Sequence, residues 1–261
     1  MLRDLAAAAH MAPAKAHRYL VSFARLGLIE QDEGTGRYDL GRYALTLGLA
    51  ALGRLDPVGI AGQALPALSE ATGQTVAVAI WANRGATMVR WQGADTPVSA
   101  SLRLGSVMPL TRSATGICFA AFGNPRTVSR YLQRELRENI RHGLAPTTAA
   151  GVERQVREAR RRGFAATNDF IPGISGFAAP VYDSDRTMAL ALVSLGYTRS
   201  FERSAPQIGR AVMRAAADIS ARLGGPPLAQ PSIQQSAQDV THSARDVRRR
   251  RAPSATQAQF P

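Results

Sequence analysis

Residues 10–20 read His-Met-Ala-Pro-Ala-Lys-Ala-His-Arg-Tyr-Leu. A short apolar helical pattern precedes this segment, and a second one continues it through Phe23 and Leu26 to Gly27. Two short extended segments, 28–30 and 37–40, then flank a glycine-containing turn at 33–36. This order predicts a helix, a tight turn, a second helix and a two-stranded wing.

These elements are the parts of a winged helix-turn-helix, whose second helix enters the major groove of double-stranded DNA. Lys15 and Arg18 are candidates for base or phosphate contacts, and their residue types favour neither role over the other. Small side chains at Ala14 and Ala16 would allow the backbone to approach the groove. The residues that we expect to contact DNA are Ala14, Lys15, His17 and Arg18 in the helix and Arg37 in the wing.

The basic residues of the chain lie mostly outside this segment. The net charge is +13 over 261 residues, yet residues 1–56 carry 7 basic and 6 acidic residues, a net of +1. Residues 57–225 carry 20 basic and 11 acidic residues, a net of +9. The overall charge therefore indicates a general attraction to polyanions, and it does not locate the surface that reads DNA.

Composition excludes several other classes of protein. A single cysteine, Cys118, rules out an intramolecular disulfide or a multi-cysteine metal site, and we expect it to lie in the core. Four histidines without ligand spacing indicate no metal centre, and we expect no cofactor. No run of about 18 apolar residues and no signal-peptide pattern is found, which predicts a cytoplasmic protein without membrane contact.

The rest of the chain predicts one α+β domain and two connecting or terminal segments. We expect a winged helix at 1–42, a linker helix at 43–56, the α+β domain at 57–225 and a disordered basic tail at 226–261. In the linker, Leu45, Leu49 and Leu52 share one face, and Leu47 and Leu55 widen it. A connector this apolar needs a partner, so we expect it to pair with a second subunit.

Within the α+β domain, the pattern predicts an antiparallel sheet with helices on its faces. The expected strands are 75–81, 86–92, 98–102, 164–168, 177–182 and 188–194. The expected helices are 58–72, 113–122, 125–138, 148–162 and 205–223.

Over residues 2 to about 224 the chain resembles the IclR family of bacterial transcriptional regulators. Three segments carry the resemblance: 10–20, the Pro-Leu-Thr-Arg-Ser-Ala-Thr-Gly stretch at 109–116, and 163–181, which contains Gly-Phe-Ala and Gly-Phe-Ala-Ala-Pro-Val. The resemblance implies an N-terminal winged helix, a C-terminal GAF-like domain that binds a small effector, and assembly into dimers or dimers of dimers.

The chain departs from the family pattern in three places. Members carry a further helix before the segment that starts here at Leu2, and an upstream start codon would explain the difference. The family's His and Lys in the middle motif are Thr111 and Ile117 here. The family's acidic run is reduced to Asp169, which could be a pocket group or a solvated one.

The start of the helix at Ser113 offers free N–H groups and a positive dipole end, which suit an anion. Ser113 could also be an ordinary helix cap. With the resemblance, we expect an effector carboxylate here, Thr115 as a hydroxyl partner, and a small organic acid with an apolar or aromatic body. The expected effector-binding residues are Met108, Ser113, Ala114, Thr115, Asp169, Ile174 and Gly176.

The sequence thus predicts a ligand-responsive transcriptional regulator of a catabolic or related operon, acting as a homodimer or homotetramer on a DNA operator. One alternative is a small-molecule sensor or interaction protein that has lost DNA binding through N-terminal truncation. Another is an enzyme with Cys118 or Ser113 as nucleophile. No base or oxyanion group accompanies either side chain, and we therefore expect no enzyme.

Overall fold

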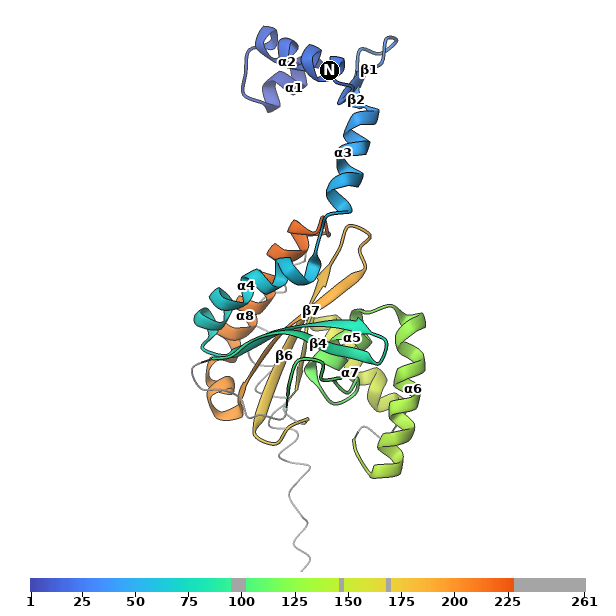
Figure 1. Ribbon diagram of the computed structural model, residues 1–261, viewed down its shortest axis with the longest axis vertical. Helices are drawn as coiled ribbons and strands as arrows, with labels where there is room; N and C mark the ends of the chain where they lie inside the picture. Colours follow the sequence, from blue (N-terminus) through green and yellow to red (C-terminus); the bar gives the residue numbers. More distant parts are fainter. Residues whose placement is uncertain (95–101, 146–147, 168–169, 228–261) are drawn as a thin grey trace, which may run out of the picture. The chain divides into compact units, whose positions relative to one another are not determined.

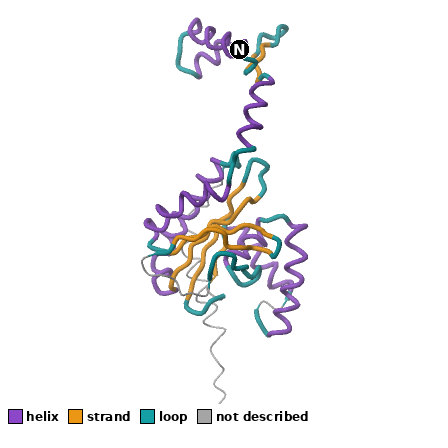
Figure 2. The backbone as a smooth tube through the Cα atoms, viewed as in Figure 1, coloured by secondary structure: helices purple, strands orange, loops and turns teal. Residues whose placement is uncertain are grey.

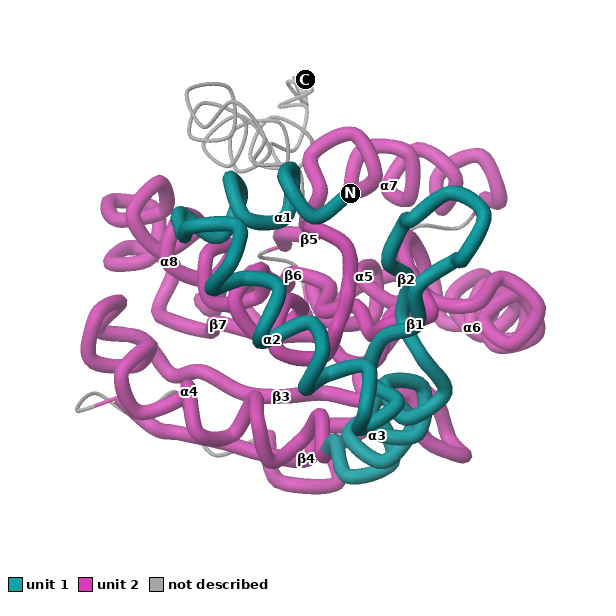
Figure 3. The backbone as a smooth tube through the Cα atoms, turned by 90° about the horizontal axis from the view of Figure 1, so that it is seen from above, with its two compact units in different colours: residues 1–55 teal, residues 56–261 magenta. Residues whose placement is uncertain are grey.

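The computed structural model describes residues 1–94, 102–145, 148–167 and 170–227 (Figure 1). The predicted strand at 98–102 lies almost entirely outside the described residues, as do Asp169 and nearly all of the predicted tail. The chain forms two compact units, Met1–Leu55 and Asp56–Pro261, which are coloured separately in Figure 3.

The first unit contains a helix-turn-helix and a two-stranded wing, as predicted. Its elements are α1 (Leu2–Ala8), α2 (Pro13–Arg25), β1 (Ile29–Gln31), β2 (Tyr38–Leu40) and α3 (Arg42–Leu52). Pro13 stands at the first turn of α2, where a missing N–H leaves no hydrogen bond unmade. In the wing turn, the Asp32 carboxylate accepts hydrogen bonds from the hydroxyl and the N–H of Thr35, which lower the pKa of Asp32.

Two glycines join α2, the wing and α3. Gly27 ends α2 with φ +71°, a conformation that favours glycine. Gly41 lies so close to the carbonyl of Gly27 that a Cβ at position 41 would collide with it. The N–H of Gly41 donates to Leu28 O over 2.9 Å, and the N–H of Tyr43 donates to Gly27 O over 3.0 Å. This crossing fixes the start of α3 beside the wing.

The second unit is built on a five-stranded antiparallel sheet in the order β4-β3-β7-β6-β5 (Figure 2). Helices α4 and α8 pack on one face, α5 packs on the other, and α6 and α7 lie against α5. The strands are β3 (Thr75–Ala82), β4 (Gly85–Gln92), β5 (Ala165–Thr167), β6 (Ile174–Tyr182) and β7 (Met188–Tyr197). The helices are α4 (Pro57–Thr72), α5 (Ala114–Phe122), α6 (Pro125–His142), α7 (Ala149–Arg162) and α8 (Thr198–Arg222).

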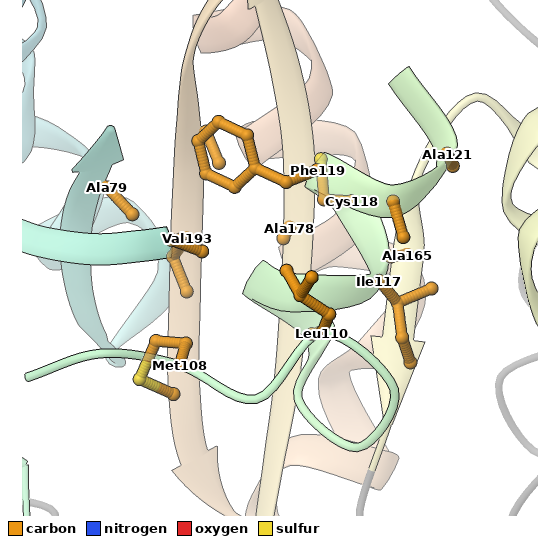
Figure 4. Packing of buried hydrophobic residues seen from close by; sticks show 14 of the residues in the cluster. Ala79, Met108, Leu110, Ile117, Cys118, Phe119, Ala121, Ala165, Ala178 and Val193 are labelled. Atoms are coloured by element: carbon orange, nitrogen blue, oxygen red, sulfur yellow. The ribbon is translucent and has the colours of Figure 1, made fainter. Parts of the chain in front are cut away.

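Alternation along β3 sorts its side chains between the two faces, as the sequence predicted. Ala77 and Ala79 belong to the apolar cluster on the α5 side, whereas the buried Val76 and Val78 alternate with them and lie on the opposite face. Small residues on the α5 side let this helix sit close to the strands. Figure 4 shows Cys118 and Phe119 of α5 beside Ala178 of β6 and Val193 of β7 in the same cluster.

Four predicted boundaries in the second unit were wrong by three or more residues. Helix α6 ends at His142 and not at residue 138, β7 ends at Tyr197 and not at residue 194, and the starts of α8 and β6 also differ. Helix α8 begins at Thr198 and not at residue 205, because Pro206 lies inside the helix and does not start it. Phe201, Ala205 and Ile208 are buried at helical spacing, so tertiary packing supports the extra turns. Strand β6 begins at Ile174, three residues before the predicted start at residue 177, and directly after Gly173, whose φ is +81°.

Among the described residues, no single helix is long and apolar enough to cross a membrane; only α3 and α4, taken together across the break between them, reach the required length and composition.

Cys118 is completely buried, as predicted, and desolvation raises the pKa of its thiol. In the unfolded chain the thiol ionises with a pKa of about 8.5, so above that pH the unfolded state binds fewer protons than the folded state and stability falls. Relative to Cys118→Ala, the wild type should lose about 2 kcal/mol of unfolding free energy between pH 8 and pH 10. Denaturant titrations of both proteins check this; a pH-independent difference would contradict a buried neutral thiol.

Candidate functional site

The exposed face of α2 carries the residues predicted to contact DNA. Ala14, Lys15, His17 and Arg18 are all exposed. Ala16 is a correction: it is only 5% exposed, so it is a packing residue of the α1–α2 pair and does not face a groove. One side of an amphipathic helix packs against the neighbouring helix, and Ala16 lies on that buried side of α2.

Two further arginines of the first unit were missed by the sequence analysis. Arg25 follows Lys15 and Arg18 at positions i, i+3 and i+10, which lie on one side of α2. Arg25 and Arg42 also line a groove of about 410 Å³ at the start of α3, and none of the described residues that line it is acidic. The sequence analysis could have found Arg25 by following the helical spacing from Lys15 and Arg18 to the end of α2.

Arg37 is exposed beside the wing turn, where its carbonyl accepts a hydrogen bond from Asp32 N over 2.9 Å. It is the only basic residue in 28–40, a segment that also contains four carboxylates. Arg37 is therefore the one wing side chain whose charge suits a DNA phosphate.

In the second unit, the Ser113 side chain caps α5. Its hydroxyl accepts from Gly116 N over 2.9 Å and donates to Pro109 O over 2.7 Å. These bonds use its proton and stabilise the first turn of the helix. Ser113 thus fixes the start of α5, and the groups still free to bind a ligand belong to the residues that follow it.

Three polar groups at this helix end have no hydrogen-bond partner within the described residues: the N–H groups of Ala114 and Thr115 and the hydroxyl of Thr115. Thr115 is only 1% exposed. The predicted residues Met108, Ala114, Ile174 and Gly176 are buried as well, and a Cβ at Gly176 would lie 3.3 Å from that of Ala114. The structure therefore brings Ala114 and Gly176 together at the start of α5, and it places Met108 and Ile174 in the same apolar cluster as Ala114.

The loop before α5 is held by a carboxylate that the sequence analysis missed. Glu135 of α6 accepts hydrogen bonds from Leu110 N (2.6 Å), Thr111 N (2.8 Å) and the Thr111 hydroxyl (2.6 Å). Asn139, one turn later and buried, donates to the same hydroxyl over 2.9 Å. Thr111 replaces the histidine that the family resemblance led us to expect, and here it belongs to this network. Glu135 and Asn139 are spaced i, i+4 on an otherwise basic helix, and this spacing is the signal in the sequence that could have predicted the network.

Glu135→Ala should lower the free energy of unfolding by about 2–3 kcal/mol, because it leaves backbone N–H groups without their charged acceptor. The matched control is Glu153→Ala, which breaks the exposed ion pair with Arg157 on α7 and should cost less than about 1 kcal/mol. Equal effects of the two substitutions in denaturant titrations would contradict the anchoring role of Glu135.

Comparison with known proteins places both units. Residues 49–221 match the family described as bacterial transcriptional regulator IclR C-terminal, and residues 1–33 match the IclR helix-turn-helix domain. The chain is 28% identical to the HTH-type transcriptional regulator BhcR of Paracoccus denitrificans, over 84% of this chain and 79% of that protein. It is 29% identical to the glycerol operon regulatory protein of Streptomyces griseus, over 85% and 88%.

A similar solved structure is that of Pseudomonas aeruginosa HmgR, with a TM-score of 0.78 and 33% identity, covering 87% of this chain and 91% of that one. The relatives are transcriptional regulators, which confirms the prediction that the chain is not an enzyme. The resemblance of its three motifs is likewise confirmed: the chain belongs to the IclR family of bacterial transcriptional regulators, which bind DNA and small-molecule effectors.

Proposed function

We propose that this regulator controls a catabolic or related operon in response to a small organic acid. The observation that carries the proposal is the set of unpaired polar groups at the buried start of α5: two backbone N–H groups and the Thr115 hydroxyl. Donors at a helix N-terminus favour a carboxylate, and the surrounding side chains are apolar. The name of one relative, the glycerol operon regulatory protein of Streptomyces griseus, supports an operon of this kind.

In this proposal residues 1–42 read DNA, 43–56 connect, and 57–225 bind the effector. The alternative of a sensor without DNA binding is not favoured, because residues 1–33 match a DNA-binding domain and α2 presents an exposed basic face. In a dimer, the two DNA-binding units can take more than one relative placement. The effector changes DNA affinity only to the extent that it binds one of these placements more tightly than the other.

Arg18 is proposed as a base contact near the middle of the exposed face of α2. Arg18→Ala should weaken binding to a selected operator duplex by about 1–3 kcal/mol, the value of a bidentate base contact. Arg54→Ala is the control, since it removes the same charge from an exposed position beyond α3. Fluorescence anisotropy at fixed salt measures both. Equal losses would show that Arg18 contributes charge without a specific contact.

The effector is proposed to bind at the start of α5 with Thr115 as a hydrogen-bond donor. Enlarging Ala114 is unsuitable as a test because Ala114 packs against Gly176. Thr115→Val keeps the shape and removes the hydroxyl, so the affinity for the acid found by thermal-shift screening should fall roughly tenfold. The control is Thr127→Val on exposed α6. An unchanged affinity in Thr115→Val would move the effector elsewhere.

A homodimer is proposed through α3, which has no buried residue. Leu45, Leu49 and Leu52 are 66%, 60% and 45% exposed, and apolar surface of this kind marks an interface. Light scattering at micromolar concentration should give twice the 27.8 kDa chain mass, and Leu49→Glu should shift it toward the monomer. A wild-type mass of one chain would contradict the proposal.

A further inference from the structure

A groove of about 440 Å³ opens on the second unit, where α6 meets the turn between β3 and β4 and the 107–112 loop. It differs from the proposed effector site: of the six effector-binding candidates that the structure describes, only Met108 lines it. Three arginines line the groove, each from a different wall: Arg84 from the turn, Arg112 from the loop and Arg134 from α6.

The walls of this groove are held to one another by hydrogen bonds. The Tyr131 hydroxyl on α6 donates to Asn83 O in the turn over 2.7 Å, and its ring meets Trp81 edge-on at 5.1 Å. The N–H of Met108 in the loop donates to Ala86 O over 2.7 Å. Glu135 holds the loop to α6, as described above. These bonds fix the turn, the loop and α6 relative to one another, so the backbone positions of the three arginines are set before any ligand binds.

The charges lining the groove are unbalanced. Two carboxylates line it, but Glu135 already accepts three hydrogen bonds from the loop, and Glu138 accepts one from Arg134 over 3.1 Å. Arg84 and Arg112 have no carboxylate partner within the described residues; the Arg112 guanidinium lies 5.9 Å from the Phe170 ring centre. An anion of two charges would complement these two arginines.

We propose that this groove is a second anion site, separate from the effector site, for a small dianion such as a phosphate group or a dicarboxylate. Arg84 binds its oxygens from the β3–β4 turn and Arg112 from the loop before α5, and Arg134 adds charge while remaining paired with Glu138. Guanidinium forks suit both oxyanions, so inorganic phosphate and succinate are used as separate probes.

Isothermal titration of the full chain with each probe tests the proposal. At least one probe should bind, Arg84→Gln should weaken it roughly tenfold or more, and Glu138→Gln, which releases Arg134, should strengthen it. Arg126→Gln is the matched control, because it removes the same charge from an exposed position of α6 outside the groove. Thr115→Val should bind the probe like the wild type, which separates this site from the proposed effector site.

The probe that binds identifies the oxyanion class. At 10 mM probe, a site with a dissociation constant of about 1 mM is mostly occupied. Binding of neither probe at this concentration would overturn the proposal. Equal weakening by Arg84→Gln and Arg126→Gln would overturn it as well, since that result would show a diffuse charge effect.

Discussion

The carboxylate of Glu135 holds the loop that leads into α5, and both proposed sites of the second unit depend on that loop. It binds the Leu110 and Thr111 backbone. A fixed loop places Ser113 as the cap of α5, and the cap leaves the next two N–H groups available at the helix end. The same loop is a wall of the arginine groove. One half-buried carboxylate therefore orders the loop that the two proposed anion sites share.

Close packing supplies the second constraint, because α5 is buried along almost its whole length. A Cβ at Gly116 would collide with the carbonyl of Pro109, and a Cβ at Gly176 would lie within 3.1 Å of Leu195. The small side chains of alanines on β3, β6 and β7 leave room above the sheet for this approach. Side chains at the start of α5 therefore have little room to move, which favours a precise site over an adaptable one.

The sequence predicted the parts of the fold that local periodicity and turn chemistry determine. The alternation in β3, the cap at Ser113 and the wing turn are local signals, and the structure contains all three. Glu135 was missed because its partners lie 24 and 25 residues away, and a glutamate in an arginine-rich helix resembles a solvated charge. The start of α8 was missed for a related reason: burial of Phe201 outweighs the local signal of Pro206.

In the proposed function, DNA reading and effector binding lie in different units, so regulation requires that the two binding events be coupled. The direct measurement is the affinity of the wild-type protein for a selected operator duplex, with and without a saturating organic acid that thermal shift has shown to bind. A regulator of this kind predicts a change of about 5–150-fold, the usual range of coupling between two sites. An acid that saturates the protein and leaves the operator affinity unchanged would contradict the account.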